Sequence, residues 1–297
     1  MTKKNNSVDS TVKPIKQIAW ATDYSKESRF CLPYVKYFTE TLKTTNHALY
    51  VLPKFSDWVL ETAFLTDDEL FKTIERTRKK SVDTINNYSK KSGITLEPVV
   101  LEGIASEEII KYGNEKDIDI VFAGRRGISD IEQILIGSTT SRLIRNTDIP
   151  VFVVHKNKRS VNIQTILCPI DFNEFSLREL EYAISLSRQL NAKLYVVHVS
   201  EFFNYRVPIF KQNKLLEKIN ERIMGIAEEH NYQIEKIIYD EGEPGQKIIE
   251  ISNKIKADVI TMATHQRKGI EKFFLGSITE KVLMYSTIPV LVLPPVK

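Results

Sequence analysis

The sequence predicts an α/β fold made of two tandem domains, each a five-stranded parallel sheet with helices on both faces. Short β-branched segments alternate with amphipathic segments along each copy. Two of the β-branched segments, 119–123 and 258–262, are almost wholly apolar, as a strand covered on both faces must be. A set of landmark residues also returns after 139 positions, pairing Gly103 with Gly242, Asp119 with Asp258, Gly137 with Gly276, and Pro150 with Pro289.

The two copies set the domain boundaries. At 297 residues the chain has the length of two domains of the usual ~100–200 residues each. Near the start of each copy, segment 18–25 resembles segment 166–173 at an offset of 148 positions, and 49–51 matches 194–196 at an offset of 145. We expect an N-terminal tail at 1–14, a first domain at 15–156, a linker at 157–161 and a second domain at 162–297.

The elements are clearest in the second copy, which begins with a β-branched strand at 165–169. The helix that follows, 176–190, repeats apolar residues at helical spacing, namely Leu177, Leu180, Ala183, Ile184 and Leu190. A second strand is expected at 193–199. The same alternation then predicts a helix at about 210–230, a strand at 235–239, a helix at 245–254, a strand at 258–262, a helix at 277–285 and a strand at 290–293.

Strands that alternate with helices require crossover connections, which make the sheet mostly parallel. We expect Asp119 and Asp258, which lead their strands, to cap them in solvent. The last strands, 151–154 and 290–293, are short and apolar, and edge strands of this kind pair readily. The two copies are therefore predicted to pack together as a pseudo-dimer within one chain, and chains to pair again as a homodimer.

The composition narrows the function. Hydrophobic residues make up 42% and charged residues 27%, as in ordinary globular proteins. Apolar runs such as 288–295 are far shorter than the ~20 residues of a membrane span, and the first residues lack a signal-peptide stretch, so we expect no membrane span and a cytoplasmic location. The net charge of +4 is spread evenly, which argues against nucleic acid as a partner. Cys31 and Cys168 lack metal-ligand spacing, so we expect buried apolar fillers and no metal site.

Two glycine-centred phrases in the first copy carry the candidate chemistry. Gly124 and Gly127 follow the fourth strand, where a turn without side chains lets main-chain N–H groups approach an anion. Gly137 and Ser138 open the last helix, whose first N–H groups and dipole attract a phosphate. The nine residues between the phrases would carry the chain out and back, so that both bends face one site. Arg125 and Arg126 would add positive charge there.

Each piece has a purely structural alternative. The Gly-x-x-Gly phrase alone is typical of a simple turn. Ser138 or Thr140 alone could be a helix N-cap or first-turn residue, and Asp23 could cap the helix after the first strand. Their joint occurrence at strand ends, where ligands bind in such sheets, favours nucleotide binding.

The same residues carry a resemblance to a family. Gly124, Gly127, Gly137 and Ser138 match the pattern Gly, two residues, Gly, nine residues, Gly-Ser/Thr of nucleotide-binding universal stress proteins. Both halves, 15–156 and 162–295, resemble universal stress protein domains, so the chain resembles a tandem universal stress protein. Supporting likenesses are Asp23, the Pro169-Ile170-Asp171 phrase, Gly103, the Gly242-Glu243-Pro244 phrase, and the Ile-Pro-Val phrases at 149–151 and 288–290.

The resemblance implies Rossmann-like domains that bind ATP, with Mg²⁺ as its companion ion, in a cleft at the strand ends. Adenine would lie near Lys54 and the nucleoside beside Asp23. The triphosphate would contact Gly127, Gly137, Ser138 and Thr140, with Arg126 adding charge. The full candidate site in domain 1 is Asp23, Lys54, Ala123, Gly124, Arg126, Gly127, Gly137, Ser138, Thr139 and Thr140.

The second copy departs from this pattern because Ala263 and Gln266 replace the two glycines. Each adds a Cβ where a phosphate would pass the backbone, so we expect weak or absent triphosphate binding, with a smaller ligand such as AMP as the alternative. His265 is interpreted as a polar turn residue and not as a metal ligand. The candidate weak site is Pro169, Asp171, Val199, Thr264, His265, Gly276, Ser277 and Thr279.

Three functions remain open on the sequence. The favoured one is a stress-response protein that binds ATP as a regulatory ligand with little or no hydrolysis, because no catalytic base or nucleophile can be identified near the glycines. The second is a slow ATP-using enzyme. The third is a nucleotide-independent scaffold or a binder of small apolar ligands, which the aromatic segment 202–205 favours. Segment 55–68 is either a lid over the nucleotide or the start of a helix.

Overall fold

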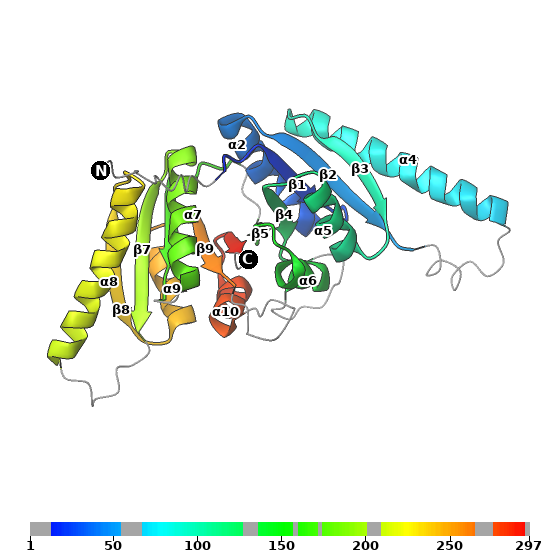
Figure 1. Cartoon of the computed structure of the whole chain (residues 1–297). Helices are drawn as coiled ribbons and strands as arrows, with labels where there is room; N and C mark the ends of the chain where they lie inside the picture. Colours follow the sequence, from blue (N-terminus) through cyan, green and yellow to red (C-terminus); the bar gives the residue numbers. More distant parts are fainter. Residues whose placement is uncertain are drawn as a thin grey trace, which may run out of the picture.

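A computed structural model describes residues 13–54, 67–126, 136–156, 160–171, 174–200, 209–264 and 276–294. Gly127, His265, Gln266, the aromatic segment 202–205 and nearly all of segment 55–68 lie outside the described residues. The described chain forms one ten-stranded sheet with helices packed along it (Figure 1). The α/β class with two domains, predicted from the sequence, is confirmed.

The elements of the first repeat are β1 (Gln17–Ala21), α1 (Lys26–Arg29), α2 (Leu32–Leu42), β2 (Thr45–Leu52), α4 (Asp67–Ser92), β3 (Glu97–Glu102), α5 (Ala105–Glu115), β4 (Ile120–Gly124), α6 (Ser138–Asn146) and β5 (Val151–Val154). Those of the second are β6 (Thr165–Pro169), α7 (Glu174–Leu190), β7 (Lys193–Ser200), α8 (Ile209–Glu229), β8 (Lys236–Glu241), α9 (Pro244–Lys254), β9 (Val259–Ala263), α10 (Ser277–Tyr285) and β10 (Val290–Leu293). The elements predicted for the second repeat agree with these within about two residues at each end, the usual ambiguity of element boundaries.

The first helix of the two repeats differs. In the second repeat it is the single helix α7, whereas in the first it is split into α1 and α2. Pro33 stands in the first turn of α2, where the missing N–H of proline leaves no hydrogen bond unmade, but a proline deeper in a continuous helix would remove one. The proline therefore favours a new helix start here.

The strand order is β3-β2-β1-β4-β5-β10-β9-β6-β7-β8. Pairing is parallel within each repeat, and the repeats join where β5 pairs antiparallel with β10, with Phe152 opposite Leu291. This is the contact between last strands that the sequence predicted for a pseudo-dimer. Strand order reverses between β1 and β4 in the first repeat and between β6 and β9 in the second, which is where ligands bind in open α/β sheets.

The hydrophobic core continues across this seam on both faces of the sheet. Phe152 and Leu291 lie in one buried cluster, and Val151, Val153 and Val290 lie in the other. The ring of Phe152 packs 4.9 Å from that of Phe122 and 5.8 Å from that of Phe38, centroid to centroid. Because each large buried apolar side chain contributes ~1.5–3 kcal/mol, the repeats stabilise each other through a shared core.

The aspartates that lead β4 and β9 do not cap those strands in solvent, so that prediction is wrong. Asp119 Oδ2 accepts hydrogen bonds from the main-chain N–H groups of Lys16 (2.7 Å) and Gln17 (2.9 Å). Asp258 Oδ2 does the same for Gln164 (2.9 Å) and Thr165 (3.1 Å). A carboxylate that accepts hydrogen bonds from two main-chain amides fixes the start of the neighbouring strand, β1 or β6. It also gives a partner to amides that lie before the first strand-to-strand hydrogen bonds.

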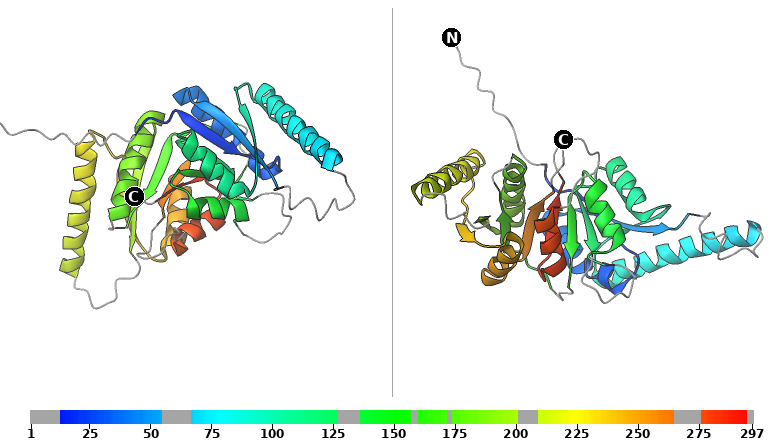
Figure 2. Two further views of the ribbon diagram at one scale, coloured as in Figure 1. Left: turned by 45° about the vertical axis from the view of Figure 1, so that its right-hand side comes forward. Right: turned by 90° about the horizontal axis from the view of Figure 1, so that it is seen from below.

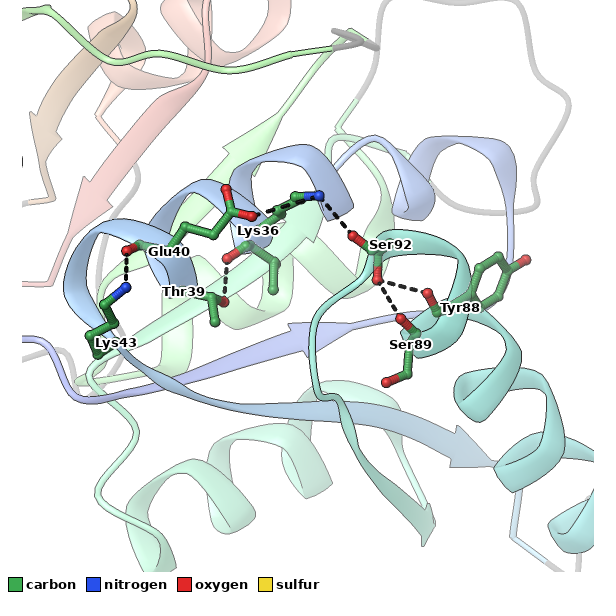
Figure 3. A network of polar contacts seen from close by, with 8 residues as sticks. Lys36, Thr39, Glu40, Lys43, Tyr88, Ser89 and Ser92 are labelled. Atoms are coloured by element: carbon green, nitrogen blue, oxygen red, sulfur yellow. Dashed lines mark hydrogen bonds and ion pairs between the residues drawn. The ribbon is translucent and has the colours of Figure 1, made fainter.

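Helix α4 runs past the end of the sheet (Figures 1 and 2). Its C-terminal end is tied to α2, because Lys36 Nζ donates to the Ser92 carbonyl (3.0 Å) and pairs with Glu40 (3.7 Å) on its own helix (Figure 3). Over the described ranges, helices combine too much charge with too little apolar length to cross a membrane.

Candidate functional site

A cavity of about 260 Å³ opens in the first repeat at the carboxyl ends of β1, β2 and β4. Its volume is slightly below the ~300–1,000 Å³ of typical ligand pockets. Of the residues predicted for this site, the cavity is lined by Asp23, Ala123, Gly124, Arg126, Gly137, Ser138, Thr139 and Thr140. Lys54 is exposed just beyond β2 and is not among the described lining residues, and Gly127 lies outside the described part of the chain.

The two glycine-centred bends face each other, as their nine-residue spacing predicted. The main-chain N–H of Gly137 donates to the carbonyl oxygen of Arg125 at 2.7 Å. A Cβ built on Gly137 would lie 3.2 Å from Arg126 Cα, so the two bends are in close contact. The hydrogen bond also corrects the sequence interpretation, because the N–H of Gly137 closes the two bends on each other and is not directed at an anion.

Gly124 has a packing role that the sequence interpretation missed. A Cβ at this position would lie 2.9 Å from both the carbonyl carbon and oxygen of Glu27 and 3.0 Å from the Ser28 nitrogen. Real side chains do not approach backbone atoms this closely. The absence of a side chain at Gly124 therefore lets α1 lie directly against β4, and this packing is its first role.

The start of α6 supplies the anion-binding feature. Gly137 is its N-cap and makes no side-chain capping bond, and Ser138 and Thr139 are exposed in the first turn. Of the structural alternative for Ser138 and Thr140, the first-turn position is confirmed, because both lie in the first turn of α6, whereas the N-cap is Gly137. The Thr140 hydroxyl donates to the Gly124 carbonyl at 2.8 Å, which fixes the helix to β4. Uncapped first-turn amides and the positive end of the helix dipole favour a phosphate at this mouth of the cavity.

Asp23 lines the cavity from the turn that follows β1. Its Oδ1 accepts a hydrogen bond from the Ser25 N–H at 3.0 Å, and Ser25 in turn caps α1 by accepting from Ser28 N–H at 3.1 Å. Asp23 therefore shapes the turn and is not the helix cap itself.

An aromatic pair that sequence reasoning missed lies beside this turn. Tyr50, near the end of β2, lines the cavity, and its ring stacks on that of Tyr24 at 4.5 Å between centroids. Burial raises the pKa of both tyrosines, that of Tyr24 to about 12, so both are neutral at physiological pH, and the Tyr50 ring gives the cavity an apolar wall. The available signal in the sequence was a tyrosine shortly after the first strand and another within the second.

The corresponding cavity of the second repeat is smaller, about 90 Å³. Pro169, Asp171, Val199 and Thr279 of the predicted set line it. Thr264 instead is buried, with its hydroxyl donating to the Leu293 carbonyl at 3.1 Å. Gly276 and Ser277 begin α10 as predicted but are not among the described lining residues, and His265 lies outside the described ranges.

A buried carboxyl group in this second cavity was not anticipated. Glu179 of α7 lines it, accepting hydrogen bonds from the Ala263 N–H (2.9 Å) and the Thr261 hydroxyl (3.0 Å). Burial raises the pKa of Glu179 to about 8. The Cys168 thiol also donates to it, at 3.9 Å, so Cys168 is buried as predicted but is more than an apolar filler. The available sequence signal was an acidic residue beside Leu180 on the apolar stripe of α7.

Over the described residues, no three His, Cys, Asp or Glu side chains gather closely enough to hold a metal ion.

Comparison with known proteins shows which family this chain resembles. A structure of a universal stress protein from Archaeoglobus fulgidus superposes with a TM-score of 0.73 at 23% identity, covering 96% of this chain and all of that one. Universal stress protein MJ0577 of Methanocaldococcus jannaschii is 28% identical over 159 residues, which are 49% of this chain and 97% of the relative. Universal stress protein MJ0531 of the same organism is 31% identical over 138 residues, 43% of this chain and 79% of that protein.

The family model matches twice, once in each repeat. The model of the Universal stress protein family covers residues 14–155 and again 162–294, which together span nearly the whole chain. The two matches coincide with the two halves of the sheet that meet at β5 and β10. This chain therefore belongs to the Universal stress protein family and carries two copies of its domain.

Proposed function

We propose that domain 1 binds ATP as a regulatory ligand of a stress-response protein, with little or no hydrolysis. The observation that carries the proposal is one cavity lined by the uncapped first turn of α6, by Arg126 and by the Asp23 turn. The helix start and the guanidinium attract phosphate, whereas a carboxylate suits the hydroxyl groups of a ribose.

The shape of the cavity supports a division of the ligand into two ends. The β2 residues Tyr50 and Val51 and the α5 residues Ala105 and Ile109 give the cavity a largely apolar stretch of lining, which suits a base and sugar. Ser138 and Thr139 are exposed, which favours phosphates at the solvent side of the cavity. Mg²⁺ accompanying ATP would be held mainly by the phosphates and water.

Binding without rapid turnover fits the chemistry of the lining. Hydrolysis needs a group that orients and deprotonates the attacking water. Among the described lining residues Asp23 is the one carboxylate, and its Oδ1 is already bonded to the Ser25 amide. This supports a nucleotide that is held as a signal over one that is consumed.

Domain 2 is proposed not to bind a triphosphate. Asp171 and Glu179 supply negative charge or carboxyl dipoles to its small cavity, and the described lining contains no Lys or Arg to offset them. Ala263 adds the Cβ that Gly124 lacks. We propose a smaller ligand for this site, and AMP is the candidate that the sequence suggested.

A charge placed at the start of α6 tests the proposal without disturbing the fold. Ser138→Asp puts a carboxylate in the first turn, where it interacts favourably with the helix dipole but repels phosphate. The matched control is Ser277→Asp, since Ser277 is the equally exposed first residue of α10. By titration calorimetry on the full chain, we expect Ser138→Asp to weaken ATP binding by about tenfold or more, or ~1.4 kcal/mol, and Ser277→Asp to leave it unchanged.

Two results would contradict the proposal. One is an ATP affinity too weak to measure in the wild-type chain. The other is an ATP affinity that Ser138→Asp leaves unchanged while circular dichroism shows the variant to be folded.

A further inference from the structure

Polar contacts cross the seam between the repeats, and one of them starts at Arg125, in the glycine-centred bend beside the domain 1 cavity. Arg125 Nη1 donates to the carbonyl oxygen of Met284, near the end of α10, at 2.6 Å. His155 Nδ1, just after β5, lies 2.6 Å from the carbonyl oxygen of Ser286, the C-cap of the same helix. Two side chains of domain 1 thus bind the last carbonyls of one helix of domain 2.

We propose that Arg125 is a positioning residue through which domain 2 holds the nucleotide cleft of domain 1, so that ATP binding in the first domain is linked to the end of α10 in the second. The inference rests on the proposed function of domain 1. It assigns Arg125 a role other than the phosphate contact expected from the sequence.

The main chain of Arg125 connects the parts of the cleft. Its N–H donates to the Val154 carbonyl at 2.9 Å, and its carbonyl accepts from the Gly137 N–H at 2.7 Å. The residue therefore joins the end of β5 to the N-cap of α6. Both neighbours, Gly124 and Arg126, line the cavity, whereas Arg125 is not among the described lining residues. Its side chain leaves the cleft and crosses the seam.

The end of α10 is a suitable anchor for a guanidinium. The last carbonyls of a helix have no partners within the helix and lie at the negative end of its dipole. Arg125 is half-buried, so its bond to Met284 is only partly screened by water. The His155 ring beside it is partly buried, and this burial together with Arg125 lowers its pKa to about 4, so it is neutral and donates its Nδ1–H to Ser286. The neutral imidazole adds a hydrogen bond without a competing positive charge.

The contacts across the seam are asymmetric, because the residues of domain 2 that correspond to Arg125 and His155 do not make them. At the offset of 139, the counterpart of Arg125 is Thr264, whose hydroxyl bonds to Leu293 within its own domain. Pro294 stands in place of His155 and has no side-chain donor. The far end of α10 reaches the cavity of domain 2, which Ile278 and Thr279 line. The cleft of domain 1 is thus connected to α10 through Arg125, and Thr264 and Pro294 make no equivalent contact with α6.

Linkage makes the effect reciprocal. If domain 2 holds the cleft in its binding geometry through Arg125, bound ATP must stabilise the Arg125–Met284 contact by the same factor. Two quantities should therefore change together: the ATP affinity of domain 1, and the hydrogen-exchange protection of the last turn of α10, residues 282–286.

The experiment compares the full-length chain with Arg125→Ala, Arg125→Lys and the control Arg145→Ala. Arg145 also crosses the seam, but as an exposed 4.0 Å ion pair with Glu280 that has no bond to the cleft. We expect Arg125→Ala to weaken ATP binding by about 5- to 20-fold and to abolish ATP-dependent protection of 282–286. Arg125→Lys should restore part of both, and Arg145→Ala should change neither.

The outcomes separate this inference from the proposed function. Failure of the wild-type chain to bind ATP overturns the proposed function and this inference with it. ATP binding with unchanged exchange at 282–286 in the wild-type chain overturns this inference alone, and that measurement needs no variant. A folded Arg125→Ala chain with wild-type ATP affinity, or an equal loss in Arg145→Ala, also overturns it.

Discussion

The main-chain N–H of Ala263 donates a 2.9 Å hydrogen bond to the carboxyl group of Glu179, which is 4% exposed. Ala263 replaces the glycine of the phosphate motif, and Glu179 enters from α7 at the position where the first repeat has Cys31. The neighbouring pair changes in the opposite sense, because Cys168 replaces the larger Trp20. The second cleft thus differs from the first by a buried carboxyl group and by the side chains that pack around it.

This acid makes the stability of the chain depend on pH. The pKa of Glu179 is about 8 in the folded state against an ordinary value of 4.5. Between these values the folded state keeps a proton that the unfolded state has lost, so the free energy of unfolding falls as pH rises from about 4.5 to about 8. We expect a loss of the order of a few kcal/mol over this window.

Chemical denaturation of Glu179→Gln measures this contribution. The stability of the wild-type chain relative to the variant should fall between pH 5 and pH 8.5, because glutamine does not titrate. Glu228→Gln, on the exposed face of α8, serves as the control. A constant difference between wild type and Glu179→Gln over this range would show that the carboxyl group is already ionised in the fold.

His155 gives a pH dependence of the opposite sense. Burial lowers its pKa from 6.5 to about 4, so as pH falls below about 6.5 the unfolded state takes up a proton that the folded state refuses. The free energy of unfolding should decline from about pH 6.5 to about pH 4. His155→Gln should flatten this decline, and His230→Gln, after the end of α8, should not. Parallel pH profiles for all three chains would contradict the prediction.

Gly124→Ala should destabilise the first repeat by about 1–3 kcal/mol, because its Cβ would overlap the main chain of Glu27 and Ser28. The reverse change, Ala263→Gly, is the matched control and should cost only about 0.5–1 kcal/mol. Urea denaturation followed by far-UV circular dichroism compares the two. Equal effects would mean that α1 gives way to the new side chain.

Phe152→Ala should destabilise both repeats together. Phe152 is fully buried at the seam opposite Leu291, and removal of such a ring costs about 3–5 kcal/mol. Phe71→Ala, which removes a ring that is 65% exposed on α4, should change stability by less than about 0.5 kcal/mol. Calorimetry of the full chain should show one cooperative transition shifted to lower temperature. A separate, unshifted transition for domain 2 would show that the repeats do not share a core.

Local sequence patterns predicted much of the fold and part of the site. The pairing of β5 with β10 follows from the repeat, which gives each copy a short apolar last strand. Strands such as β6 and helices such as α10 follow from periodicity, because this pattern acts over a few residues. The prediction that the Gly124 and Gly137 bends face each other was right for the same reason. The roles of individual atoms were harder to predict. Asp119 was assigned to solvent, and Gly137 to an anion, although each bonds a neighbouring segment of main chain.

The sequence alone determined the doubled α/β architecture and the place of the cleft, since both are encoded in spacing that repeats along the chain. Only the tertiary structure decided which polar groups form the hydrogen bonds that hold that cleft together. Arg125 and Glu179 could be assigned only once α10 and β9 were placed against them, because hydrogen bonding and burial depend on segments that are distant in sequence.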